Sequence, residues 1–221
     1  MRAPRPRLLA PLALCAVLLV ACGDDDEDSA APATTAEGEC AEVEAPAPKD
    51  EKFDAPKLVL RRGEPAAATV QTSCGSFVIE LDTKGSPKTA NSFAFLAEQG
   101  FYDSTVFHRI APGFVIQGGD PKGDGTGGPG YSVTEAPPQD TTYARGLVAM
   151  AKTAVEPPGA SGSQFFVVTA PADAGLPPDY AVLGEVTEGI EVVETIGELG
   201  DPATEQPLQT VTIDGVTISK G

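Results

Sequence analysis

The clearest pattern in this chain is a two-residue alternation of apolar and polar side chains in its last two thirds. In 76–81, Phe77, Ile79 and Leu81 alternate with polar neighbours, and a Ser-Cys-Gly turn separates this run from 68–72, so the two runs predict a hairpin. Shorter runs of the same kind predict further strands at 106–110, 114–118, 147–151, 164–169, 181–186 and 211–218.

Two segments have helical spacing instead. Ser86 and Pro87 offer an N-cap and a proline in the first turn, and apolar residues then recur at helical intervals from Ala90 to Ala97 before Gly100. A second apolar stripe runs through 188–196. Many short strands with only two helices favour a mainly β fold, a closed antiparallel barrel, over alternating βαβ layers.

The beginning of the chain has the order of a secretory signal. Three arginines precede an apolar run at 8–21 that is too short to span a bilayer. Leu19-Val20-Ala21-Cys22 fits a bacterial lipobox, which predicts cleavage before Cys22 and diacylglycerol on its thiol. The alternatives are an ordinary signal peptide that ends in Ala-Cys, and a short uncleaved membrane anchor.

Four segments follow from these patterns. Residues 1–21 are predicted to be the signal peptide, and 22–52, which is acidic and rich in alanine and proline, a disordered tether. Residues 53–67 are predicted to be an arm packed on the domain, and 68–221 the domain itself.

The net charge and the cysteines limit which partners the protein can bind and in which compartment it can act. Removal of 1–21 takes away three arginines and no acid, so the formal charge falls from −17 to −20. Such acidity argues against a nucleic-acid partner and against electrostatic membrane binding, which leaves the lipid anchor as the only membrane contact. After loss of Cys15 and lipidation of Cys22, only Cys40 and Cys74 remain; we expect them to form a disulfide that stabilises the fold by ~3–4 kcal/mol.

The most informative string is FHRIAPGFVIQGGD at 107–120. Period-2 alternation is expected to place Phe107 and Arg109 on one face, and a Pro-Gly turn can bring Phe114 and Gln117 near them. A cation and an amide would then border an apolar slot. The string SGSQFFVVT at 161–169 predicts another strand.

These strings, followed by YAVLGEV at 180–186, resemble the signature blocks of the cyclophilin family of peptidyl-prolyl cis-trans isomerases. The resemblance covers about 68–218. It implies an eight-stranded barrel capped by a helix at each end, with a packed interior and a site on an outer face. It also implies an enzyme that accelerates X-Pro isomerisation without a cofactor.

The resemblance assigns roles to individual residues. The catalytic set that it implies is Arg109, Phe114 and Gln117. The implied substrate-binding residues are Val115, Ala151, Lys152, Thr153, Gln164, Phe166, Leu176, Tyr180 and Leu183. The chain departs from the usual family residues at Val115, Lys152, Gly175, Tyr180 and Leu183. We expect catalysis to survive these departures, whereas affinity for cyclosporin is left open because Gly175 replaces a tryptophan.

Other candidate sites are weaker. His108 is the single histidine, so a structural role is favoured and a zinc site is not expected. The glycines of 123–128 satisfy GxGxxG, but no helix is predicted after them, which favours a loop beside the substrate groove. The run 159–163 fails the GxSxG pattern of serine hydrolases.

The expected protein is therefore a monomeric isomerase, lipid-anchored on the extracytoplasmic face of a bacterial plasma membrane, that acts on proline-containing segments of secreted or envelope proteins. The alternative is a non-catalytic adaptor or chaperone that binds proline-containing peptides. An anchored solute-binding protein is disfavoured, because the chain has no two-lobed α/β pattern.

Overall fold

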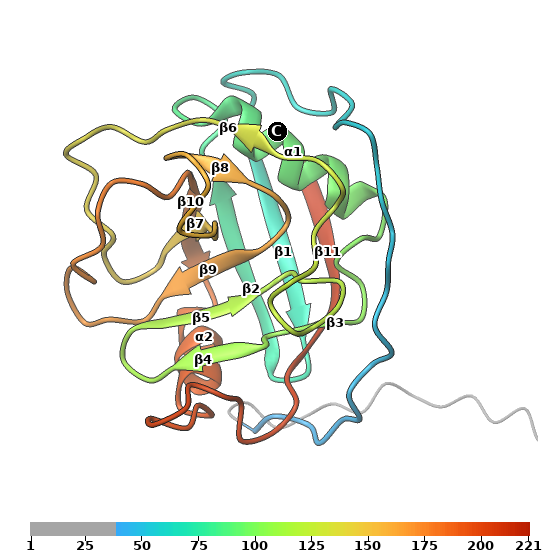
Figure 1. Cartoon of the computed structure of the whole chain (residues 1–221), viewed down its shortest axis with the longest axis vertical. Coiled ribbons are helices and arrows are strands. Elements are labelled where there is room, and N and C mark those ends of the chain that lie inside the picture. Colours follow the sequence, from blue (N-terminus) through green and yellow to red (C-terminus); the bar gives the residue numbers. More distant parts are fainter. Residues whose placement is uncertain (1–38) are drawn as a thin grey trace, which may run out of the picture. The chain divides into compact units, whose positions relative to one another are not determined.

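A computed structural model describes residues 39–221. Its main element is a curled antiparallel sheet of nine strands in the order β3-β11-β1-β2-β10-β7-β9-β5-β4 (Figure 1). The strands are β1 (Ala66–Thr72), β2 (Gly75–Leu81), β3 (Thr105–Val106), β4 (Arg109–Ala111), β5 (Val115–Gly118), β7 (Leu147–Met150), β9 (Phe165–Val168), β10 (Val182–Glu188) and β11 (Thr212–Lys220). Two short strands, β6 (Val133–Thr134) and β8 (Ala160–Ser161), form a separate pair.

The prediction of a closed, eight-stranded barrel needs correction. The hydrogen-bonded sheet has nine strands, and its edge strands β3 and β4 do not pair with each other. The additional strand arises because the predicted strand 106–110 breaks at Phe107 and His108. Its first part pairs with β11 and its second with β5, so this segment joins opposite edges of one sheet.

The interior of the curled sheet is filled with side chains. Helix α1 (Pro87–Glu98) covers one end and α2 (Ile190–Gly197) the other, as Figure 1 shows. Phe93 of α1 stacks on Tyr102 and meets Phe165 edge to face, with centroid separations of 4.8 and 5.6 Å. Val193 and Ile196 of α2 are fully buried at the other end. A ligand site must therefore lie on the outer face of the sheet.

The start of α1 differs from its predicted cap. Pro87 occupies the first turn as expected, but the side chain of Ser86 makes no capping hydrogen bond. The carboxylate of Glu135 accepts instead the backbone N–H groups of Lys88 and Thr89, at 2.9 and 3.0 Å. A side chain distant in sequence thus satisfies the free donors of the first turn.

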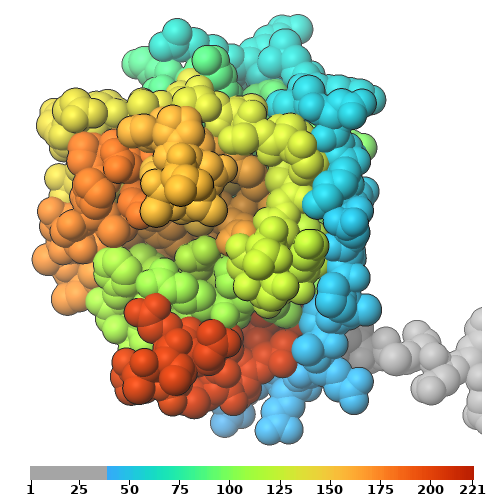
Figure 2. Space-filling view, viewed as in Figure 1, coloured from blue at the N-terminus to red at the C-terminus, as the bar shows by residue number. Residues whose placement is uncertain are grey.

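The segment 39–65 lies along the domain as an extended arm, blue in Figure 2. A disulfide joins Cys40 to Cys74 in the β1–β2 turn. Further along, Lys49 donates from Nζ to two backbone carbonyl oxygens, and the ring of Phe53 packs against Phe95 at 5.3 Å. The arm therefore begins before residue 53, and the part of the predicted tether from Cys40 to 52 is held by covalent and hydrogen-bond contacts.

Residues 1–38, which include the predicted signal peptide and Cys22, lie outside the described part of the chain. Within 39–221, no helix combines the length and apolarity that crossing a bilayer requires. The same residues hold no cluster of three or more side chains able to bind a metal ion.

Candidate active site

The site is built on the outer face of three neighbouring strands, β5, β9 and β7. Along β5 the side chains alternate, so Ile116 packs in the interior cluster whereas Val115 packs in a second cluster outside it. On β9, Phe165 faces inward and Phe166 outward in the same way. The outer cluster is a compact apolar surface that the two strands present together.

A pocket of about 210 Å³ opens on this surface. Its apolar floor and walls combine strand residues with residues from the loops that follow. It is lined by Arg109, Phe114, Val115, Gln117, Ala151, Lys152, Phe166, Leu176 and Tyr180. Nine of the twelve residues assigned above to catalysis or substrate binding therefore meet at one small cavity with a single guanidinium at its border.

The guanidinium of Arg109 is held at the pocket by three neighbours. Its Nε donates to Glu205 Oε2 at 2.7 Å, and its Nη1 donates to Gln117 Oε1 at 3.3 Å. Its central carbon lies 5.8 Å from the centroid of the Phe114 ring. Because a guanidinium has five N–H groups, two such bonds leave several donors for a ligand.

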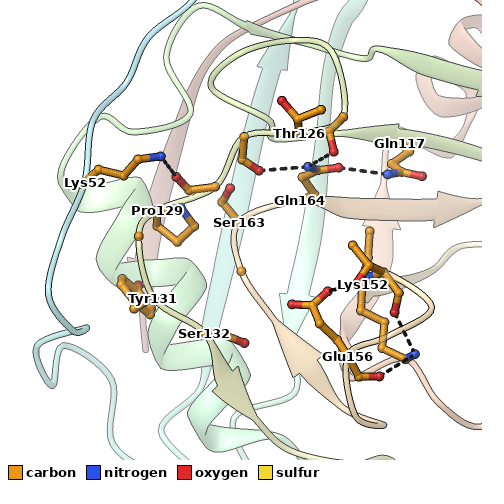
Figure 3. A pocket seen from close by; sticks show the side chains of 17 residues that line it. Lys52, Gln117, Thr126, Pro129, Tyr131, Ser132, Lys152, Glu156, Ser163 and Gln164 are labelled. Carbon is orange, nitrogen blue, oxygen red and sulfur yellow. Dashed lines mark hydrogen bonds between the residues drawn. The ribbon is translucent and has the colours of Figure 1, made fainter.

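Gln117 links this arginine to the glycine-rich loop. The register of β4 and β5 pairs Gln117 directly with Arg109, which explains their contact. Its Nε2 donates to Gln164 Oε1 at 3.1 Å, and Gln164 donates in turn to the carbonyl oxygens of Gly125 and Gly127, both at 3.0 Å (Figure 3). Both glutamine amides have their orientation set by this chain of hydrogen bonds.

Besides Phe114, two aromatic residues line the pocket, Phe166 and Tyr180. The ring of Phe166 meets Tyr180 edge to face at 5.4 Å, and Tyr180 meets Tyr143 at 6.0 Å. Tyr143 donates its hydroxyl to the Tyr180 carbonyl at 2.7 Å and accepts the Tyr180 N–H at 3.0 Å, and burial raises its pKa. Tyr143 was not predicted from the sequence, because it lies in an irregular segment without strand or helix periodicity.

A larger cavity of about 810 Å³ adjoins the first and shares Gln117, Ala151 and Lys152 with it (Figure 3). Thr153 and Gln164, which were predicted to bind substrate, line this cavity and not the smaller pocket. Figure 2 shows the hollowed face between the green strands β4 and β5 and the yellow and orange loops of 150–165.

Two side chains, those of Leu183 and Phe107, pack in the interior, and for Phe107 this overturns the expected shared face with Arg109. Leu183 is fully buried in the interior cluster and does not line the pocket, because β10 directs it inward. Phe107 also faces the interior, where its ring lies 6.2 Å from that of Phe165. It cannot share a face with Arg109, since the strand breaks between them and period-2 alternation does not hold across the break.

His108 lies half-buried near the same hydrogen-bond chain. Its Nε2 is 3.5 Å from Gln117 Nε2, and desolvation by burial lowers its pKa. A Cβ on Gly125 would lie 3.8 Å from its ring, so the ring sits under the glycine-rich loop. The buried carboxylate of Asp120 holds that loop through the N–H groups of three of the next five residues, Lys122, Asp124 and Gly125.

Comparison with known proteins agrees with this geometry. Residues 67–218 match the family model described as "Cyclophilin type peptidyl-prolyl cis-trans isomerase/CLD". The chain belongs to the cyclophilin family. The arm at 39–65 lies before the part of the chain that the family model covers.

Several relatives are bacterial. Peptidyl-prolyl cis-trans isomerase B of Streptomyces anulatus is 38% identical over 170 residues, which cover 68% of this chain and 95% of that protein. A probable isomerase B of Mycobacterium tuberculosis is 36% identical in an alignment of 197 positions that covers 76% of this chain and 62% of the relative. Among solved structures, a cyclophilin from Cryptosporidium parvum, determined in the presence of the dipeptide Ala-Pro, matches with a TM-score of 0.64 at 30% identity, over 70% of this chain and 99% of that one.

Proposed function

We propose that this cyclophilin accelerates cis–trans isomerisation of X-Pro bonds during folding of secreted or envelope proteins. The observation that carries the proposal is the guanidinium of Arg109 at the border of a small apolar pocket. The Ala-Pro dipeptide present with the Cryptosporidium parvum relative supports a proline-containing peptide as the ligand.

The pocket suits a reaction in which no bond is made or broken. Rotation about a prolyl amide interrupts its resonance against a barrier of ~18–20 kcal/mol. The twisted transition state has a localised lone pair on the proline nitrogen, so an N–H donor directed at that atom stabilises it over the planar ground state. Arg109 supplies the donor, the apolar surface around Phe114 and Phe166 holds the ring, and Gln117 keeps the guanidinium in place.

The direct test is a refolding reaction limited by proline isomerisation. We expect wild-type protein to accelerate it and Arg109→Ala to lower kcat/KM by about 100-fold or more, as for loss of one transition-state donor. The control is Arg145→Ala, because Arg145 forms a comparable surface ion pair with Glu194 and does not line the pocket.

Two outcomes would reject catalysis by this site. Full activity of Arg109→Ala would remove Arg109 from the mechanism. Binding of a proline-containing peptide by wild-type protein without any acceleration would favour the non-catalytic adaptor.

We also propose that the protein acts on the extracytoplasmic face of a bacterial plasma membrane, attached through lipid on Cys22. Support comes from the sequence alone, namely the basic start, the apolar run at 8–21 and the residues before Cys22. Wild-type protein expressed in a bacterium should incorporate labelled fatty acid and sediment with membranes, and Cys22→Ala should do neither. Equal labelling of both proteins would exclude this anchor.

A further inference from the structure

We propose that Glu205 is a positioning residue, which orients the guanidinium of Arg109 for catalysis. The inference rests on the proposed function. Glu205 lies in the loop between α2 and β11, 96 residues after Arg109 in the chain and outside the strings that carry the family resemblance.

Two contacts attach Glu205 to the strand that bears the arginine. Its carboxylate accepts the Nε–H of Arg109 at 2.7 Å, and its backbone carbonyl accepts the N–H of Ile110 at 2.9 Å. Strand β4 is an edge strand that pairs only with β5, so Ile110 has this donor free for the loop. The loop therefore serves as a partial substitute for a tenth strand at this edge.

The loop around Glu205 is held in one conformation by hydrogen bonds within it and by close packing against β4. Glu205 adopts φ 57°, a conformation that residues other than glycine seldom take, and its N–H donates to the Asp201 carbonyl at 2.7 Å. The Asp201 carboxylate accepts the N–H groups of Ala203 and Thr204 at 2.8 and 2.9 Å. The loop also lies against β4, because a Cβ on Gly200 would come within 2.2 Å of the Ile110 carbonyl oxygen.

This arrangement determines which arginine donors a substrate can meet. Glu205 engages Nε and Gln117 engages one hydrogen of Nη1, so the second Nη1 hydrogen and both on Nη2 are left for the proline nitrogen. The two partners restrain the guanidinium at two different nitrogens. Loss of either one lets the plane rotate, and a misplaced donor reduces transition-state stabilisation more than ground-state binding.

The competing explanation is an ordinary surface ion pair. The side chains of Arg109 and Glu205 are 35% and 44% exposed, so their attraction is screened by solvent and contributes little to stability. The pair Arg145–Glu194 has nearly the same exposure, 43% and 45%, and lies away from the pocket. It therefore provides a matched control, Glu194→Ala.

The test measures kcat and KM with a proline-containing peptide. We expect Glu205→Ala to lower kcat about tenfold with KM within twofold, which is less than the hundredfold that a 1 Å misplacement can cost. Glu205→Gln should recover part of the loss, because its amide oxygen can still accept from Nε. Glu194→Ala should retain wild-type kcat, and all three variants should keep wild-type thermal unfolding.

A double mutant shows whether Glu205 acts through Arg109. In the Arg109→Ala background, Glu205→Ala should cause no further loss of kcat. A loss of the same factor in both backgrounds, or wild-type kcat in Glu205→Ala, would overturn the inference. Inactivity of wild-type protein would instead reject the proposed function, so the two failures are distinguishable.

A measurement that does not depend on activity keeps the inference testable if Glu205→Ala does not fold. In wild-type protein, the Nε–H of Arg109 should give an NMR signal that exchanges slowly with solvent, and Glu205→Gln should speed that exchange. An Arg109 signal that exchanges in wild-type protein as fast as those of other exposed arginines would overturn the inference.

Discussion

His108 illustrates how burial decides the role of a single side chain. Its ring is half-buried beside Gln117, and desolvation lowers its pKa, although the charges of Asp120 and Asp124 act in the opposite direction. The ring is therefore neutral at neutral pH. Since isomerisation transfers no proton, a neutral ring that packs beside Gln117 is compatible with catalysis by Arg109.

The same burial makes folding stability depend on pH. The pKa of His108 is lower in the folded protein than its ordinary value of 6.5, so the unfolded chain binds the proton more tightly. The contribution of neutral His108 is fully present above about pH 6.5 and is lost as pH falls from there through the lowered folded pKa, at about 1.4 kcal/mol per unit of pKa difference.

Urea unfolding of wild type and His108→Gln at pH 7.5, 6 and 5 measures this effect. Wild-type protein should lose more of its free energy of unfolding than His108→Gln between pH 7.5 and 5. Equal losses in the two proteins would show that other groups cause the acid sensitivity.

At the scale of elements, the short pair β6 and β8 has a role beyond its size. Glu135 directly follows β6, and its N–H donates to the Gly159 carbonyl at 2.9 Å. This places the carboxylate at the start of α1, where it accepts two backbone N–H groups. The segment of β6 and Glu135, whose sequence shows no clear strand pattern, thus attaches its loop to α1, the helix that covers one end of the sheet.

Removal of this cap should destabilise the fold measurably. We expect Glu135→Ala to lower the free energy of unfolding by about 1 kcal/mol, the usual effect of losing an N-terminal helix cap, helped by the helix dipole. Asp140→Ala, at an exposed position in the same loop, is the control and should change little. Chemical denaturation measures both, and equal stabilities would show that α1 does not depend on Glu135.

At the scale of the whole molecule, the arm extends the site beyond the region that the family model covers. Lys52 donates to the Gly128 carbonyl at 2.7 Å and lines the larger cavity, although it precedes residue 67, where the family model begins (Figure 3). Two contacts earlier in the arm hold it on the domain: the Cys40–Cys74 disulfide, and the backbone N–H of Lys49, which donates to the Pro121 carbonyl at 2.8 Å. The arm therefore contributes part of the wall of this cavity.

The sequence predicted most elements of the sheet because side-chain alternation is a local property. Both helices and the β1–β2 hairpin appear within a few residues of their expected bounds. The break at Phe107 and His108 was not predicted, because alternation continues through it and only pairing with two different strands shows it. The same limit applies to Leu183, whose direction depends on which face of the curled sheet is enclosed.

What the sequence determined by itself is the family, the arginine that we propose to be catalytic and the apolar residues of its pocket, because these lie in short strings whose order is specific. Only the tertiary structure decided what holds the arginine in place. Glu205 and Tyr143 reach the site from distant loops with no periodic pattern, and a contact between residues so far apart depends on how the sheet curls and where each loop returns to it.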